Sequence, residues 1–170
     1  MGLKTILKWG LFLGVSIVLG TQLLTWLGLG LTNWFVLLTY ILVIGISILS
    51  LIELRSREDI KLNYLNAILF IIGIILISRF IFQTYMFLYT RYIDPSWIDT
   101  VSETWTISLQ ESNVATNEIE QQISSFRKSY EAIPMFTSSL ISYSVPQFII
   151  GIIVSTIFVF ANQKKSTRKD

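Results

Sequence analysis

Arg79 is the residue whose type and position point most directly to chemistry. It is a charged side chain inside a long apolar stretch, and Gln83 follows one helical turn later. Placing Arg near the centre of a bilayer costs about 2.5–3.5 kcal/mol, and none of the long apolar stretches contains an Asp or Glu to pair with it. One interpretation makes Arg79 and Gln83 contacts for an anionic ligand, such as a lipid headgroup or a carboxylate. The other extends the Arg79 side chain to the outer membrane interface.

Other residue types that commonly carry chemistry are missing or badly spaced. The chain has no Cys and no His, which excludes disulfides, thiolate metal sites, a cysteine nucleophile and the usual general base near neutral pH. Glu118 and Glu120 are two residues apart, so they do not share a helix face, and no loop has the ligand spacing of a calcium motif. Gly28-x-Gly30 lacks the rest of a nucleotide fingerprint. We therefore expect no enzyme, no cofactor and no metal.

The composition favours a membrane protein. The 170 residues fit one domain, and 52% are hydrophobic while only 14% are charged, against about 25% charged in soluble domains. The net charge is +2, and the 13 Lys and Arg residues do not gather into a basic face interleaved with aromatics. Nucleic acid is therefore not an expected partner, whereas the lipid bilayer is.

Four long apolar stretches predict four membrane-spanning helices, at about 9–29, 34–52, 64–88 and 136–160. Each is close to or above the roughly 20 residues that a helix needs to cross about 30 Å of hydrocarbon. Barrel strands are shorter and alternate in polarity, which these stretches do not. The expected fold is an all-α, integral membrane four-helix bundle forming one domain over residues 1–170.

Basic residues near the membrane predict the orientation, because cytoplasmic loops carry the excess of Lys and Arg. Opposite the termini lie three: Arg91, Arg127 and Lys128. On the side of the termini lie nine: Lys4, Lys8, Arg55, Arg57, Lys61, Lys164, Lys165, Arg168 and Lys169. We therefore expect both termini in the cytoplasm. Residues 1–20 also fit a signal peptide, whose removal would leave three spans in the same orientation.

The third connection, about 92–133, is expected outside the cytoplasm as an acidic, helical insertion. Trp97, Val101 and Trp105 are spaced four apart, and Asn113 is the expected break between two amphipathic helices. A second apolar face comprises Ile119, Ile123, Phe126, Tyr130 and Ile133. Two alternatives stay open: the helices pack as a cap, or this face binds a partner's helix or a second copy.

Small residues mark expected helix contacts inside the membrane. Gly10 and Gly14 are four apart in the first span, as are Gly151 and Ser155 in the fourth, and such pairs let two helix backbones approach closely. They serve either packing within the chain or dimerisation. Pro146 is expected to kink the fourth helix or to mark a late start of it.

The layout resembles one known family. A charged turn follows the second span, the third span runs into Tyr89-Thr90-Arg91-Tyr92-Ile93-Asp94-Pro95, and a last span carries Pro146 and Gly151. Together with the long acidic loop, this is similar to DUF4199, a family of uncharacterised bacterial membrane proteins found mainly in Bacteroidetes. Many members have a Gly-Gly pair before the third span, where this chain has Arg57-Glu58-Asp59-Ile60-Lys61. The resemblance implies four spans and an inner-membrane location, and it brings no activity.

These observations favour a non-enzymatic structural, accessory or interaction role in the bacterial cell envelope. The alternative is binding or transport of a small anionic or lipid ligand near Arg79. An external carboxylate enzyme ranks third, since no acids are visibly arranged for catalysis.

Overall fold

The computed structural model describes residues 3–28, 33–56, 63–129 and 144–166, and in these ranges every regular element is a helix. The long apolar helices are α1 (Leu3–Trp26), α2 (Asn33–Arg55), α3 (Tyr64–Leu88) and α7 (Val145–Ser166). A π-helical turn, η1 (Tyr89–Ile93), continues α3, and the amphipathic helices α4 (Trp97–Glu111) and α5 (Thr116–Ser129) follow. The all-α expectation is confirmed.

The chain divides into two compact units. The first comprises Met1–Phe82 and Tyr143–Asp170, and the second comprises Gln83–Ser142. The expected external insertion at about 92–133 lies within the second unit, whose boundary falls inside α3.

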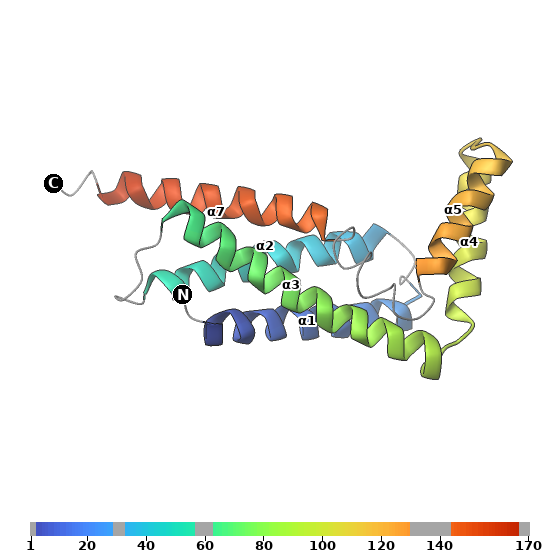
Figure 1. The fold of residues 1–170 in the computed structure, drawn as a ribbon, viewed down its shortest axis with the longest axis horizontal. Coiled ribbons are helices and arrows are strands. Elements are labelled where there is room, and N and C mark those ends of the chain that lie inside the picture. Colours follow the sequence, from blue (N-terminus) through green and yellow to red (C-terminus); the bar gives the residue numbers. More distant parts are fainter. Residues whose placement is uncertain (1–2, 29–32, 57–62, 130–143, 167–170) are drawn as a thin grey trace. The chain divides into compact units, whose positions relative to one another are not determined.

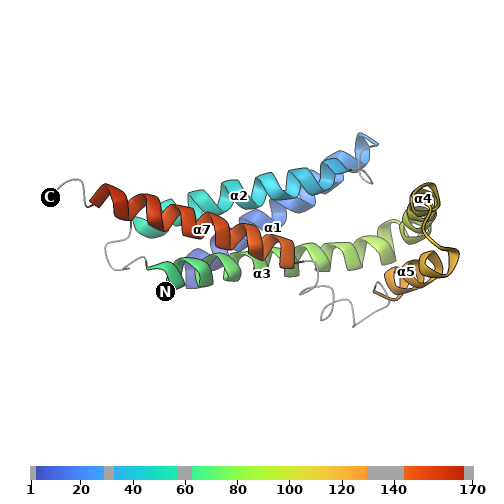
Figure 2. The same ribbon diagram turned by 90° about the horizontal axis from the view of Figure 1, so that it is seen from above.

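Helices α1, α2, α7 and most of α3 form the first unit, which Figures 1 and 2 show from two sides. Helix α2 packs on α1 and on α7. Helix α3 approaches α1 near Gly10 and Gly14, and approaches α7 near Gly151. The buried side chains between the helices form one apolar core: Leu13, Ile17, Val43, Ile46, Leu51, Leu54, Ala67, Phe70, Ile71, Ile74, Ile75 and Val159.

The outward faces of these helices are apolar as well. Leu19, Ile41 and Ile157 are each more than half exposed, and a helix that is apolar all round requires an apolar environment on every side. Three described helices are long and apolar enough to cross a membrane, namely Leu3–Trp26, Trp34–Arg55 and Tyr64–Ile93, while Val145–Ala161 is a shorter apolar helix.

Hydroxyl groups inside the apolar helices bond to the preceding turn. Thr21 Oγ1 donates to Ile17 O at 2.7 Å, Ser78 Oγ donates to Ile75 O at 2.8 Å, and Ser155 Oγ donates to Gly151 O at 2.8 Å. Because lipid offers no partners, such bonds let Ser and Thr lie in a membrane helix without an unsatisfied hydroxyl.

The ends of α1 and α7 can be compared with the expected spans. Helix α1 begins at Leu3, before the expected span of about 9–29, since a helix can continue beyond the hydrocarbon layer. Helix α7 begins at Val145, which puts Pro146 in its first turn, where Pro costs little. Of the two expectations for Pro146, the late start is the one observed. Residues 136–143 of the expected fourth span lie outside the described ranges.

In the second unit, α4 and α5 lie side by side (Figures 1 and 2). The chain reverses at Asn113, whose φ of 56° is the left-handed conformation that Asn tolerates, as the sequence predicts. The rings of Trp105 and Phe126 meet edge to face, with centroids 5.5 Å apart, and Arg127 pairs with Asp99 at 2.8 Å. Apolar and charged contacts thus both join the two helices.

The glycine contacts give a first prediction. A Cβ at Gly14 would lie 2.8 Å from Ile81 Cδ1 and 3.1 Å from Ser78 Cα, whereas a Cβ at Gly45 would meet nothing within 4 Å. We therefore expect Gly14→Ala to destabilise the protein by about 1–3 kcal/mol through overpacking. Gly45→Ala is the matched control, with a neutral or slightly stabilising effect expected from helix propensity. Unfolding titrations in detergent micelles compare the two, and equal midpoints would contradict the close approach of α1 and α3.

Candidate functional site

The Arg79 side chain reaches across from α3 to α7. Its Nε donates a hydrogen bond to Gln147 Oε1 at 2.6 Å, and its guanidinium carbon lies 6.0 Å from the centre of the Phe82 ring. Phe82 in turn stacks on Phe35 of α2, with centroids 5.9 Å apart. The guanidinium therefore contacts Gln147 of α7 and lies near Phe82 of its own helix. Through the Phe82–Phe35 pair, this cluster also reaches α2.

Gln147 is the residue that sequence reasoning missed. Sequence spacing pairs Arg79 with Gln83, whereas the structure pairs Arg79 with Gln147, 68 residues along the chain. The sequence offered one signal for it: Gln147 is a polar amide inside an apolar stretch, directly after Pro146. Gln83 is 5% exposed and belongs to the second compact unit.

The amide of Gln147 is buried and half satisfied. The side chain is 1% exposed, and its Nε2 has no hydrogen-bond partner. Because Arg79 only donates, its bond to Oε1 fixes which end of the amide is the donor. A buried donor without a partner costs about 1–3 kcal/mol. The Gln147 side chain thus has a buried N–H donor without an acceptor, and the same side chain is bonded to Arg79.

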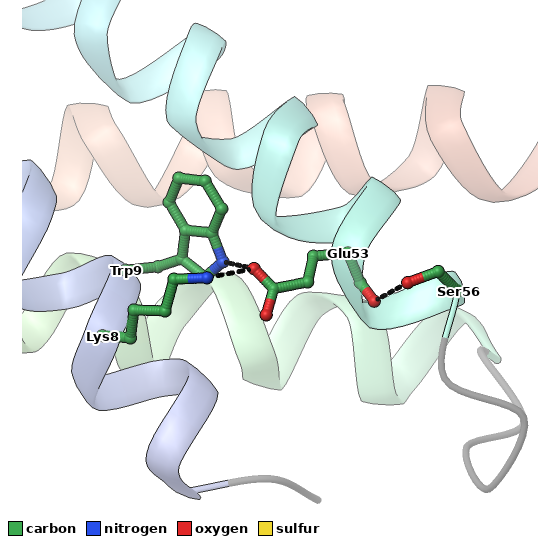
Figure 3. A network of polar contacts seen from close by, with 4 residues as sticks. All are labelled: Lys8, Trp9, Glu53 and Ser56. Carbon is green, nitrogen blue, oxygen red and sulfur yellow. Dashed lines mark hydrogen bonds and ion pairs between the residues drawn. The ribbon is translucent and has the colours of Figure 1, made fainter.

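A second polar cluster joins α1 to α2 near the start of α1. Figure 3 shows Lys8 and Trp9 pointing toward the carboxylate of Glu53. Lys8 Nζ and Trp9 Nε1 both donate to Glu53 Oε2, at 2.7 Å and 2.8 Å, and Ser56 Oγ donates to the Glu53 backbone carbonyl at 2.7 Å. Because the Lys8 and Glu53 side chains are 60% and 26% exposed, the ion pair contributes little, about 0–1 kcal/mol. Its effect is to position one end of α1 against α2.

The small residues face other helices of the same unit. A Cβ at Gly10 would lie 2.7 Å from Ile77 Cβ, and a Cβ at Gly151 would lie 2.7 Å from Ile71 Cγ2. Ser155 is fully buried. These contacts are all within one chain, and dimerisation through the same residues stays a prediction.

The expected partner face lies largely on α5. Ile119 is 5% exposed, Ile123 and Phe126 are half-buried, and Tyr130 lies outside the described residues. A groove with a volume of about 440 Å³ runs between α4 and α5. Its lining is Thr106, Ile119, Glu120, Ile123, Ser124, Arg127 and Lys128. The apolar face is therefore partly used for packing and partly accessible from this groove.

No group of three His, Cys, Asp or Glu residues in the described ranges is placed to hold a metal ion. The first unit thus has two polar clusters between its apolar helices, and the second unit has a groove on the α4–α5 pair. None of them presents an arrangement of nucleophile and base.

Comparison with known proteins gives a family and no activity. No curated protein and no solved structure matches the chain. The model of one family, described as a protein of unknown function, matches residues 8–159. This range includes α2 to α5, most of α1 and α7, and both Arg79 and Gln147. The match confirms the resemblance drawn from the sequence, and the chain belongs to the DUF4199 family.

Proposed function

We propose that this protein is a non-enzymatic component of the bacterial inner membrane that acts by binding a partner protein through α4 and α5. The observation that carries the proposal is the second compact unit, in which an acidic helical pair follows directly on an apolar helix suited to a membrane. In this arrangement the four apolar helices serve as an anchor, and the helical pair serves as the binding module.

The charge of the helical pair indicates the chemistry of the partner. Residues 97–129 contain five acids and two bases, a net charge of −3. The Arg127–Asp99 ion pair has no net charge. The excess negative charge therefore comes from four glutamates and is only partly offset by Lys128; these glutamates are Glu103, Glu111, Glu118 and Glu120. All five of these remaining side chains are exposed. The complementary partner is a basic segment that also offers apolar side chains to Ile119 and Ile123 in the groove.

The same proposal places both termini in the cytoplasm and α4–α5 outside. It is supported by the Lys and Arg distribution, nine against three. Packing against a partner is also favoured over lying flat on the membrane, because anionic lipid surfaces repel an acidic helical pair.

Single cysteines test the orientation, because the chain has none of its own. We expect Asn117→Cys on α5 to react with a membrane-impermeant maleimide in intact spheroplasts. Ser56→Cys, at the end of α2, should react only after permeabilisation. Both residues are exposed, so accessibility to the reagent is matched, and the unmodified chain is the blank. The reverse labelling pattern would contradict the proposed orientation.

Photo-crosslinking tests the partner. A photoreactive residue at Ser124 in the groove should yield a discrete adduct with a basic protein, whereas one at Leu19 on the outward face of α1 should label lipid. Replacing Glu111, Glu118 and Glu120 by Gln should reduce the Ser124 adduct severalfold and weaken its salt dependence. Lys128→Gln, the control, should preserve it.

Two outcomes would contradict the proposal. One is an adduct whose yield does not change when the acids are neutralised at equal protein level. The other is an adduct of twice the mass of the chain, which would assign the groove to self-association.

A further inference from the structure

The groove on the α4–α5 pair follows one stripe of α5. Its lining on this helix consists of adjacent pairs, each four residues after the one before: Ile119 and Glu120, Ile123 and Ser124, and Arg127 and Lys128. Residues four apart lie one above the other on the same face of a helix. From the first pair to the last, the stripe rises by about 12 Å, at about 1.5 Å per residue. The groove therefore runs along the helix axis, with Thr106 of α4 on its other side.

The shape and chemistry of the groove favour a helical occupant. Ile119 and Ile123 line it with apolar side chains. The regular elements of the described part of this unit are all helices, so their interior backbone groups are bonded within each helix and offer no strand edge. An extended segment would leave its own backbone groups without partners against these apolar side chains, which is costly. A helix satisfies its backbone internally and needs only to fit the groove.

Charge is divided unevenly between the two ends of the α4–α5 pair. The helices run antiparallel, since Arg127 near the end of α5 pairs with Asp99 near the start of α4. At this end the ion pair has no net charge, and Lys128 adds a positive one. At the other end, where the chain reverses, residues 110–121 contain three acids and no base. These acids form the acidic end, and all are exposed: Glu111, Glu118 and Glu120.

The helix dipole relates this charge pattern to a direction. Bases are favoured in the last turn of a helix and acids in the first. Helix α5 follows the rule, with Glu118 in its first turn and Arg127 and Lys128 in its last. A partner helix of the same kind places its basic last turn at the acidic end only if it runs antiparallel to α5. This direction also brings opposite ends of the two helix dipoles together.

We infer that the groove binds an amphipathic helix of the partner protein, antiparallel to α5, with its basic last turn at the acidic end. Its apolar side chains contact Ile119 and Ile123, so that α4, α5 and the partner form a three-helix arrangement. This inference rests on the proposed function, because it assigns the conformation and direction of the partner segment in the same groove. A partner bound in another conformation or direction would leave the proposed function intact.

Photo-crosslinking from two positions of the full chain, in cells, measures conformation and direction together. Asn117 and Ser124 are both exposed on α5, and seven residues separate them, or about 10.5 Å along the axis. A photoreactive residue is placed at one position or the other, and mass spectrometry of the digested adducts identifies the partner residue reached from each. We expect the partner residue reached from Asn117 to lie about seven positions C-terminal to the one reached from Ser124.

Two results would overturn the inference while leaving the proposed function standing. A separation of about three positions would indicate an extended partner segment, because a strand rises about 3.3 Å per residue. The opposite order of the two partner residues would indicate a helix parallel to α5. Absence of an adduct from both positions would instead overturn the proposed function, and this inference with it.

Glu111→Lys and Glu103→Lys test the acidic end with the same change of charge. Both residues are exposed on α4, and only Glu111 belongs to the acidic end. A lysine in the last turn of α4 is favoured by the helix dipole, so Glu111→Lys should not weaken the helix. At equal protein level, we expect Glu111→Lys to reduce the Asn117 adduct severalfold more than Glu103→Lys does. Equal reductions would overturn the inference, because binding would then depend on total charge and not on the position of the acids.

Discussion

Close approach of helix backbones is the constraint on which the four-helix unit depends. Its helices are apolar both inside and outside, so burying apolar surface gives no preference for one partner helix over lipid. The choice of partner helix must then depend on how closely the helix surfaces fit. Gly10 and Gly14 of α1 have no side chain, and this leaves space for Ile77 and Ile81 of α3. Gly151 admits Ile71 in the same way on the other side. Helix α3 is thereby held between α1 and α7.

Two polar contacts add specificity to this packing. The cluster at Glu53 joins α1 to α2, and the Arg79–Gln147 bond joins α3 to α7. Together with the glycine contacts they connect all four apolar helices of the unit. The two clusters differ in kind, because Glu53 receives two donors at one oxygen, whereas the amide of Gln147 retains a buried donor without an acceptor.

The sequence predicted what depends on local pattern. Apolar runs of about 20 residues, the break at Asn113 and the amphipathic helices around it can each be read from neighbouring residues, and the structure shows them. The contacts of Arg79 could not be read in this way. Gln147 is 68 residues away, and Lys8 and Glu53 are 45 apart, so only the packing of whole helices brings them together. Helix α1 begins before the expected span for a related reason: hydropathy detects the hydrocarbon layer, whereas backbone hydrogen bonding can continue past it.

The π-helical turn at Tyr89–Ile93 has a consequence for comparing sequences within the family. Asp94 N reaches back five residues to Tyr89 O at 2.8 Å, one residue further than in an α-helix. The turn therefore holds one residue that an α-helical chain would not need. Removing that residue would restore α-helical winding without disturbing the apolar periodicity of α3 or α4. In alignments of DUF4199 members, a single-residue gap is thus expected to fall within 89–93 rather than in the helices on either side.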